Sequence, residues 1–205
     1  HPSDLVILAA RPAMGKTAFV LNLALHAAVE EKKSVMIFSL EMSNSQLLQR
    51  FLSAKARIPL SNLRNGFLES DHWVKLGSAS SKLAESSIQI ADMPNINVME
   101  IRAMARRAKA AGKLDMIIID YLQLIQGRDK NGESRQQEIS DISRSLKIIA
   151  RELEVPVIAL SQLSRGPEQR ADRRPMLSDL RDSGAIEQDA DMVVFLYRDD
   201  YYNED

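Results

Sequence analysis

The clearest chemical signal in the sequence is a short loop that combines a glycine, a lysine and a threonine. The segment Ala10–Thr17 reads ARPAMGKT. It follows an apolar run and precedes a helical pattern, which is the context that a phosphate-binding loop requires. A helix start offers unpaired N–H groups and about half a positive charge. We therefore predict that a nucleotide binds to Arg11, Pro12, Ala13, Met14, Gly15, Lys16, Thr17 and Ala18.

Three side chains of this loop have separate expected roles. Gly15 would let the backbone approach the phosphates, Lys16 would bring a positive charge to them, and Thr17 would offer a hydroxyl to Mg²⁺. The usual pattern begins with glycine, whereas this chain has Ala10. Alanine is compatible with that position if its φ stays negative. An ordinary turn with a chance Gly-Lys-Thr is the alternative, which the strand and helix on either side disfavour.

Two acidic residues follow apolar runs and could complete such a site. Asp120 ends the run MIIID and would hold Mg²⁺ through water, opposite Thr17. Taken alone, a turn residue at a strand end would be the better interpretation, but the phosphate loop earlier in the chain favours the metal role. Glu41 follows Val35–Leu40. If that strand lies beside the first, Glu41 would polarise the attacking water. The alternative is a charge placed for the dipole of the next helix.

Two further segments carry polar groups with less specific patterns. Gln162 ends the run IALSQ and could sense the γ-phosphate, or it could be a solvated loop residue. In the segment Arg173–Asp191, Gly184 allows a tight backbone and Arg181 is a candidate phosphate ligand. This segment has no aromatic residue, so base stacking is not expected. Taken on its own, this segment is better interpreted as a polar surface loop followed by a capped helix.

These residues must be positioned by a sheet and its helices. Short apolar runs alternate with helical patterns, which predicts an α/β fold with a mostly parallel sheet covered on both faces. One helix is expected over Gly15–Glu30, and pairs of the capping-box type begin three more: Ser43 with Gln46, Asn97 with Glu100, and Ser134 with Gln137. The expected strands are Leu5–Ala10, Ser34–Leu40, Ile88–Ala91, Met116–Asp120, Val155–Leu160 and Met192–Tyr197.

Composition narrows the class of protein. The chain has 205 residues, 45% of them apolar, which suits one domain with a sizeable core. It has no cysteine, and its three histidines are scattered, so neither a disulfide framework nor a cysteine or histidine metal site is expected. The net charge of −1 does not indicate nucleic acid, so any basic surface must be local. No apolar run approaches the roughly 20 residues of a membrane span, and no signal peptide is visible. We expect a cytoplasmic protein.

Five segments together resemble a known family. They are ARPAMGKT, FSLEMS, IIIDYLQLI, ALSQLSR and SDLRDSGAIEQDAD, in this order along the whole chain. Their combination is similar to the C-terminal motor of bacterial replicative helicases of the DnaB type. The resemblance implies a RecA-like ATPase core over residues 1–205, a homohexameric ring, ATP with Mg²⁺, and movement on single-stranded DNA. It also implies primase and a helicase loader as partners.

The resemblance carries over to single residues. It implies that Lys16 and Thr17 bind phosphate and Mg²⁺, that Glu41 is catalytic, and that Asp120 lies beside the metal. It implies a γ-phosphate sensor in Gln162, a weaker coupling role for Arg50, and DNA contacts from Arg181, Asp182 and Gly184. The family's N-terminal domain, linker helix and arginine-finger hairpin have no counterpart in this sequence, so we expect a truncated fragment. A P-loop kinase, a RecA-type recombinase and a non-motor nucleotide switch are the rival interpretations.

Overall fold

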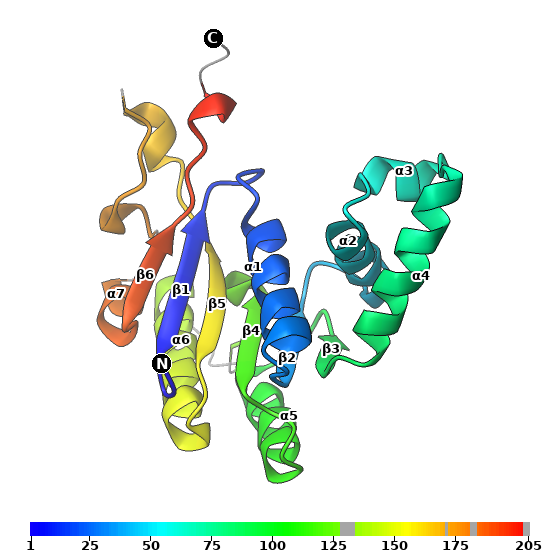
Figure 1. Cartoon of the computed structure of the whole chain (residues 1–205). Helices are drawn as coiled ribbons and strands as arrows, with labels where there is room; N and C mark the ends of the chain where they lie inside the picture. Colours follow the sequence, from blue (N-terminus) through cyan, green and yellow to red (C-terminus); the bar gives the residue numbers. More distant parts are fainter. Residues whose placement is uncertain (128–133, 171, 181–183, 203–205) are drawn as a thin grey trace.

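A six-stranded sheet forms the centre of the molecule (Figure 1). The computed structural model describes residues 1–127, 134–170, 172–180 and 184–202. The strand order is β3-β2-β4-β5-β1-β6, and each pair of neighbours is parallel. The strands are β1 (Leu5–Ala10), β2 (Val35–Ser39), β3 (Ile88–Asp92), β4 (Met116–Asp120), β5 (Val157–Gln162) and β6 (Met192–Phe195).

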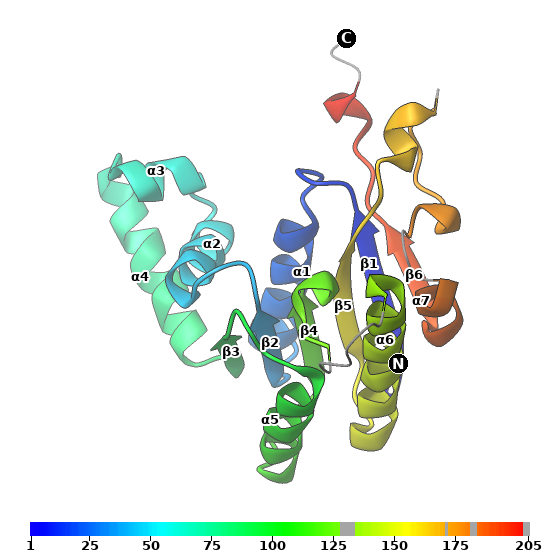
Figure 2. The same ribbon diagram turned by 180° about the vertical axis from the view of Figure 1, so that it is seen from behind.

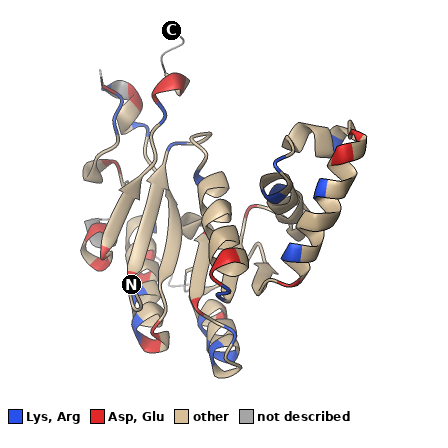
Figure 3. Cartoon of the chain, viewed as in Figure 1, with Lys and Arg blue, Asp and Glu red and all other residues tan. Residues whose placement is uncertain are grey.

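All six predicted strands are present, with small shifts at their ends. The largest shift is in β5, which begins after Pro156 and continues to Gln162, because proline lacks the N–H that a strand interior needs. β6 ends at Phe195 instead of Tyr197. The charged residues lie mainly on helices and loops (Figure 3), and within the strands they occur only at the ends of β3 and β4. This distribution explains why apolar runs were sufficient to locate the strands.

Helices cover both faces of the sheet, as predicted (Figures 1 and 2). One face packs against α1 (Lys16–Leu25) and α2 (Asn44–Ala56), and the other against α5 (Val98–Ala110), α6 (Arg135–Leu153) and α7 (Gly184–Asp189). The predicted helix over Gly15–Glu30 is two elements, because a π-helical turn, His26–Glu30, follows α1. Two helices have no predicted counterpart, α3 (Leu60–Asn65) and α4 (Ser70–Ala84). They pack with α2 beyond the β3 edge through a small separate core.

Two of the three predicted capping boxes are complete, and the third is formed in part. Ser43 with Gln46, and Asn97 with Glu100, form complete capping boxes at α2 and α5. At α6 the Gln137 N–H donates to Ser134 Oγ over 3.3 Å, but only this half of the box is present. Ser134 therefore acts as an N-cap alone. Among the described helices, none combines the length and apolar character that crossing a bilayer demands.

Ile118 lies in the middle of β4, and its side chain is fully buried against α1. Replacing Ile118 by alanine is expected to lower the free energy of unfolding by about 2–5 kcal/mol, because it opens a cavity in the core. Urea denaturation measures the change. Ile148→Ala is the control, since that side chain is 49% exposed and should lose far less. Equal losses for the two variants would contradict this assignment of the core.

Candidate nucleotide site

The carboxyl ends of the strands bring the predicted site residues to one edge of the sheet. β4, β5 and β1 are consecutive neighbours in the sheet. They end at Asp120, Gln162 and Ala10, the last of which leads into the predicted phosphate loop. In open parallel sheets this edge is where ligands bind. The chain thus gathers one side of the predicted site from segments more than 100 residues apart, such as Thr17 and Asp120 (|i−j| = 103).

The loop between β1 and α1 leaves a helix start open to an anion. Gly15 is the N-cap of α1 with φ of 89°, a left-handed conformation that glycine adopts most readily. Among the described residues, no side chain caps this helix, and its first turn holds no acidic residue. The N–H groups of the first turn are therefore available to a ligand. Ala10 is the final residue of β1, and its φ is not positive, so alanine is compatible with that position as expected.

Lys16, Thr17 and Asp120 lie together at the start of this helix. Thr17 Oγ1 donates to Asp120 Oδ2 over 2.9 Å, and Lys16 Nζ donates to the carbonyl oxygen of Ser161 over 3.1 Å. Lys16 Nζ also lies 5.3 Å from the ring centroid of Tyr121. The second carboxylate oxygen of Asp120, Oδ1, is buried and has no hydrogen-bond partner among the described residues. A hydroxyl beside a carboxylate with one unused oxygen suits a hydrated divalent cation.

Burial disfavours the charged forms of both Lys16 and Asp120. It lowers the pKa of Lys16, while the carboxylates of Asp120 and Glu41 act in the opposite direction. Burial also raises the pKa of Asp120, and Glu41 adds to this. The Thr17 hydrogen bond and the charges of Lys16 and Arg50 oppose the increase. A phosphate near Lys16 and a cation near Asp120 would supply the missing counter-charges.

Glu41 lies near the site although its strand, β2, is not a neighbour of β1. Its predicted role is conditional on its strand lying beside the first strand, but β4 and β5 separate β2 from β1 in the sheet. That premise is wrong, because sequence order does not fix strand order. Glu41 is nevertheless exposed near the same edge, and its charge acts on the pKa of both Lys16 and Asp120. The common edge of a parallel sheet brings Glu41 close without strand adjacency.

Gln123 is a site residue that the sequence did not indicate. It lies in a short 3₁₀ turn, Leu122–Leu124, directly after the end of β4. Its amide nitrogen donates to Ser161 Oγ over 2.9 Å and to the Gln162 carbonyl oxygen over 3.3 Å. Its amide oxygen accepts the Gln162 N–H over 3.3 Å. Gln123 therefore fixes the end of β5, while the side chain of Gln162 keeps its amide free of hydrogen bonds to the described residues.

Arg11 takes part in a contact that no pattern signals. Its guanidinium donates to the Leu163 carbonyl oxygen over 3.0 Å and to Glu168 Oε1 over 2.8 and 2.5 Å. Arg11 and Gln162 also line one cavity of about 280 Å³, together with Gln123, Ile139, Leu163, Ser164 and Arg165. The arginine at the entry to the phosphate loop thus adjoins the predicted sensor.

The remaining predicted residues are the DNA contacts Arg181, Asp182 and Gly184, and the coupling residue Arg50. Arg181 and Asp182 lie outside the described residues, and Gly184 is the first residue of α7. Arg50 lies close enough for its charge to lower the pKa of Asp120, and its Nε is buried without a hydrogen-bond partner in the described part of the chain. The position of Arg50 is therefore consistent with the predicted coupling role, which remains a prediction.

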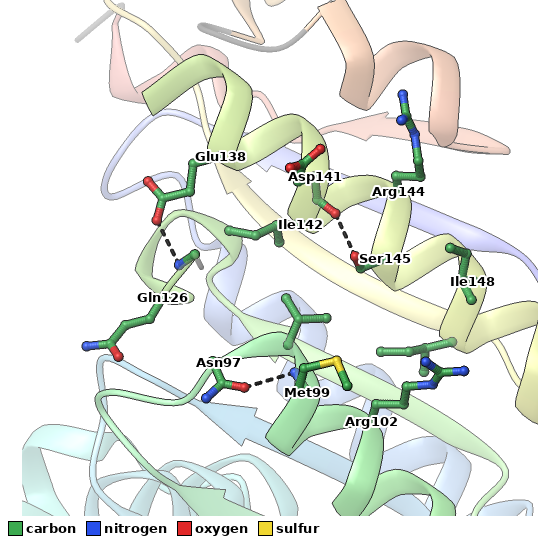
Figure 4. Close-up of a pocket in the computed structure, with 13 residues that line it drawn as sticks. Asn97, Met99, Arg102, Gln126, Glu138, Asp141, Ile142, Arg144, Ser145 and Ile148 are labelled. Atoms are coloured by element: carbon green, nitrogen blue, oxygen red, sulfur yellow. Dashed lines mark hydrogen bonds between the residues drawn. The ribbon is translucent and has the colours of Figure 1, made fainter. Parts of the chain in front are cut away.

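A larger cavity lies elsewhere, between α5 and α6 (Figure 4). Its volume is about 670 Å³, and its lining includes Asn97, Arg102, Glu138 and Arg144. Glu138 accepts the Gly127 N–H at one end, over 2.7 Å. None of the residues predicted to bind nucleotide lines this cavity. The candidate nucleotide site is instead an open surface, where Pro12, Ala13, Gly15 and Ala18 are exposed.

The parallel sheet and the loop at the end of its first strand define a P-loop nucleotide-binding protein of the α/β class. Comparison with known families identifies it further. The family described as the DnaB-like helicase C-terminal domain matches residues 1–205. The chain belongs to this family, and its fold is that of the RecA-like ATPase domains of such helicases.

Individual relatives agree with this assignment. The replicative DNA helicase DnaB of Geobacillus stearothermophilus is 60% identical over 203 residues, which are 99% of this chain and 45% of that protein. The replicative DNA helicase DnaC of Bacillus subtilis (strain 168) is 59% identical over the same shares. A solved structure of a DnaB-like replicative helicase, described with its interactions with primase, has a TM-score of 0.95 at 44% identity. The match covers 100% of this chain and 49% of the chain in that structure. The chain thus spans less than half of the two curated relatives.

Gln123→Ala tests the support of β5. The change removes the partners of Ser161 Oγ and of both backbone groups of Gln162, so it is expected to lower the free energy of unfolding by about 1–3 kcal/mol. Urea denaturation at neutral pH is the measurement. Gln136→Ala, at an exposed position on α6, is the matched control and should change stability by less than about 0.5 kcal/mol. Indistinguishable denaturation curves for the two variants would show that these bonds add nothing.

Proposed function

We propose that this chain is the motor domain of a replicative DNA helicase, which hydrolyses ATP to move along single-stranded DNA. One observation carries the proposal: an uncapped helix start that presents Lys16, with Thr17 bonded to a buried Asp120 that has one unused oxygen. This arrangement suits the phosphates of ATP and a hydrated cation. The family membership and the high identity to named replicative helicases support the choice of helicase over other P-loop ATPases.

ATP would place its phosphates along Arg11–Ala18. The N–H groups of the loop and the first turn of α1 would hold phosphate oxygens, and Lys16 would neutralise charge on the β- and γ-phosphates. Thr17 and Asp120 would hold Mg²⁺, Thr17 through its hydroxyl and Asp120 through water. The ion supplies positive charge to the phosphates in the transition state. We propose ATP and Mg²⁺ as the cofactors on these grounds.

Glu41 would act as the general base. It would accept a proton from water while the water oxygen attacks the γ-phosphorus and the bond to the β-phosphate oxygen breaks. Its exposed carboxylate lies near enough to Lys16 and Asp120 to influence both pKa values. Gln162 would hydrogen-bond the γ-phosphate, for which its side-chain amide is available, and would lose that partner after hydrolysis.

The interactions with other molecules are inferred from the family. We propose a homohexameric ring in which a neighbouring subunit supplies an arginine finger, and DNA contacts from Arg181, Asp182 and Gly184. Primase and a helicase loader are the proposed partners, and the cytoplasm of a bacterium is the proposed location. Contacts to DNA phosphates alone would give binding that is tolerant of sequence and weakened by salt.

The direct test measures ATP hydrolysis by the full-length protein, with and without single-stranded DNA, together with strand displacement on a forked duplex. We expect stimulation by DNA. In the Glu41→Gln variant, nucleotide binding should persist while hydrolysis falls by about 10²–10⁴-fold, because the water loses its base. Glu31→Gln removes an exposed carboxylate elsewhere and serves as the control. Hydrolysis that DNA does not stimulate, or that survives in Glu41→Gln, would refute the proposal.

Gln162→Ala tests the sensor role. ATP binding should stay within about threefold of wild type, because the amide meets only the γ-phosphate, whereas DNA stimulation of hydrolysis should be lost. Nucleotide affinity by fluorescence titration and steady-state hydrolysis separate these effects. Should ATP binding collapse instead, Gln162 would be a binding residue and not a sensor.

A further inference from the structure

An ion pair joins the phosphate loop to a segment that follows β5. Arg11 Nη2 lies 2.5 Å from Glu168 Oε1, and the Arg11 Nε–H donates to the same oxygen over 2.8 Å. The Arg11 side chain is only 13% exposed, whereas that of Glu168 is 44% exposed. A charge-assisted contact with one partner largely shielded from water is stronger than a solvated surface pair. It spans 157 residues of sequence and links two loops at the same edge of the sheet.

Glu168 belongs to the segment that follows β5, of which the structure describes residues 163–170 and 172–180; we call these described residues the 163–180 loop. Its two ends are tied together by Asp179, whose side chain is 4% exposed. Arg170 donates through Nη1 to Asp179 Oδ1 over 2.8 Å and pairs with Oδ2 as well, and the Met176 N–H donates to Oδ2 over 2.8 Å. The Ser164 N–H donates to the Asp179 carbonyl oxygen over 3.0 Å. These contacts hold the start of the loop, at Ser164, against its end, at Asp179.

Close packing strengthens this link between the two ends. A Cβ added at Gly166 would lie 2.6 Å from Asp179 Oδ1, so the backbone of the turn that carries Glu168 lies directly on the Asp179 carboxylate. Glu168 is in that same 3₁₀ turn, Gly166–Gln169. The hydrogen bond from Arg170 also holds the pKa of Asp179 below its usual range, so this carboxylate is charged at neutral pH. The loop is a folded unit with Glu168 at its contact with the phosphate loop.

We propose that Glu168 is a positioning residue that couples nucleotide binding to the conformation of the 163–180 loop. The inference rests on the proposed function, because it requires phosphates beside Arg11. A phosphate competes with a carboxylate for the same guanidinium. Nucleotide binding therefore weakens the Arg11–Glu168 pair and loosens the loop. The loop ends at Leu180, immediately before the predicted DNA contact Arg181 in the sequence, so this release connects the ATP site to the DNA site.

Amide hydrogen exchange of the full-length protein, with and without ADP and Mg²⁺, tests the coupling. In the wild type, ADP should slow exchange at residues 11–18 and speed exchange in the 163–180 loop roughly tenfold, the size expected when one charge-assisted hydrogen bond is weakened. In Glu168→Gln, the loop should exchange rapidly without nucleotide, and ADP should cause no further change there. Glu168→Asp should restore part of the wild-type response.

The control variant is Asp172→Asn, which removes one negative charge from the same loop. Asp172 is 62% exposed, lies 4.0 Å from Arg170 Nε and has no contact with Arg11 among the described residues. It should respond to ADP like the wild type. Protection of residues 11–18 without any change in the 163–180 loop would overturn the coupling, as would a normal response in Glu168→Gln.

The same measurement separates this inference from the proposed function. If ADP does not protect residues 11–18, the nucleotide site itself is wrong, and both proposals fall. If ADP protects them and loosens the loop, but DNA does not stimulate hydrolysis, the coupling stands and the helicase assignment fails. If DNA stimulates hydrolysis equally in wild type and Glu168→Gln, and the loop responds in both, the helicase assignment stands and the role of Glu168 is refuted.

Discussion

The hydrogen bond between Thr17 and Asp120 is the interaction on which the site depends, because it joins the first helix to the end of a central strand. Both residues belong to regular elements: Thr17 is the second residue of α1, and Asp120 is the last residue of β4. β4 and β1, the strand that leads into α1, end at the same edge of the sheet, which brings the two residues to that edge. The burial that makes the sheet stable also disfavours the charges of Lys16 and Asp120 at this edge. The same packing thus positions Lys16 and Asp120 and favours the binding of a ligand that carries the opposite charges.

The sequence was sufficient for the fold where the pattern was local. Apolar runs located the six strands because those strands are covered on both faces, and capping residues located the starts of α2 and α5. The phosphate loop is a contiguous motif, so it could be located without knowing the tertiary structure. α3 and α4 were missed because they pack against α2 with a small core of few apolar residues, which leaves a weak periodic signal.

The site was less predictable where it depended on strand order. The premise about Glu41 failed because β4 and β5 lie between β2 and β1, and only the assembled sheet reveals this. Gln123 is an uncharged residue in a short turn, and its three contacts to β5 involve two backbone groups that carry no sequence signal. The Arg11–Glu168 pair joins two polar loops, where many pairings of charges are possible. Such long-range contacts follow from topology and cannot be read from spacing.

The place of β1 in the sheet has a consequence for how the protein folds as it is synthesised. β1 contains some of the first residues of this chain, yet its two neighbours in the sheet are β5 and β6, whose residues are translated much later. The strand that leads into the phosphate loop therefore has no hydrogen-bonding neighbour while the intervening segments emerge from the ribosome. Non-local pairing of this kind slows folding and leaves strand edges exposed in the meantime. The strand that leads into the phosphate loop thus gains its first native neighbour only once β5 has been made.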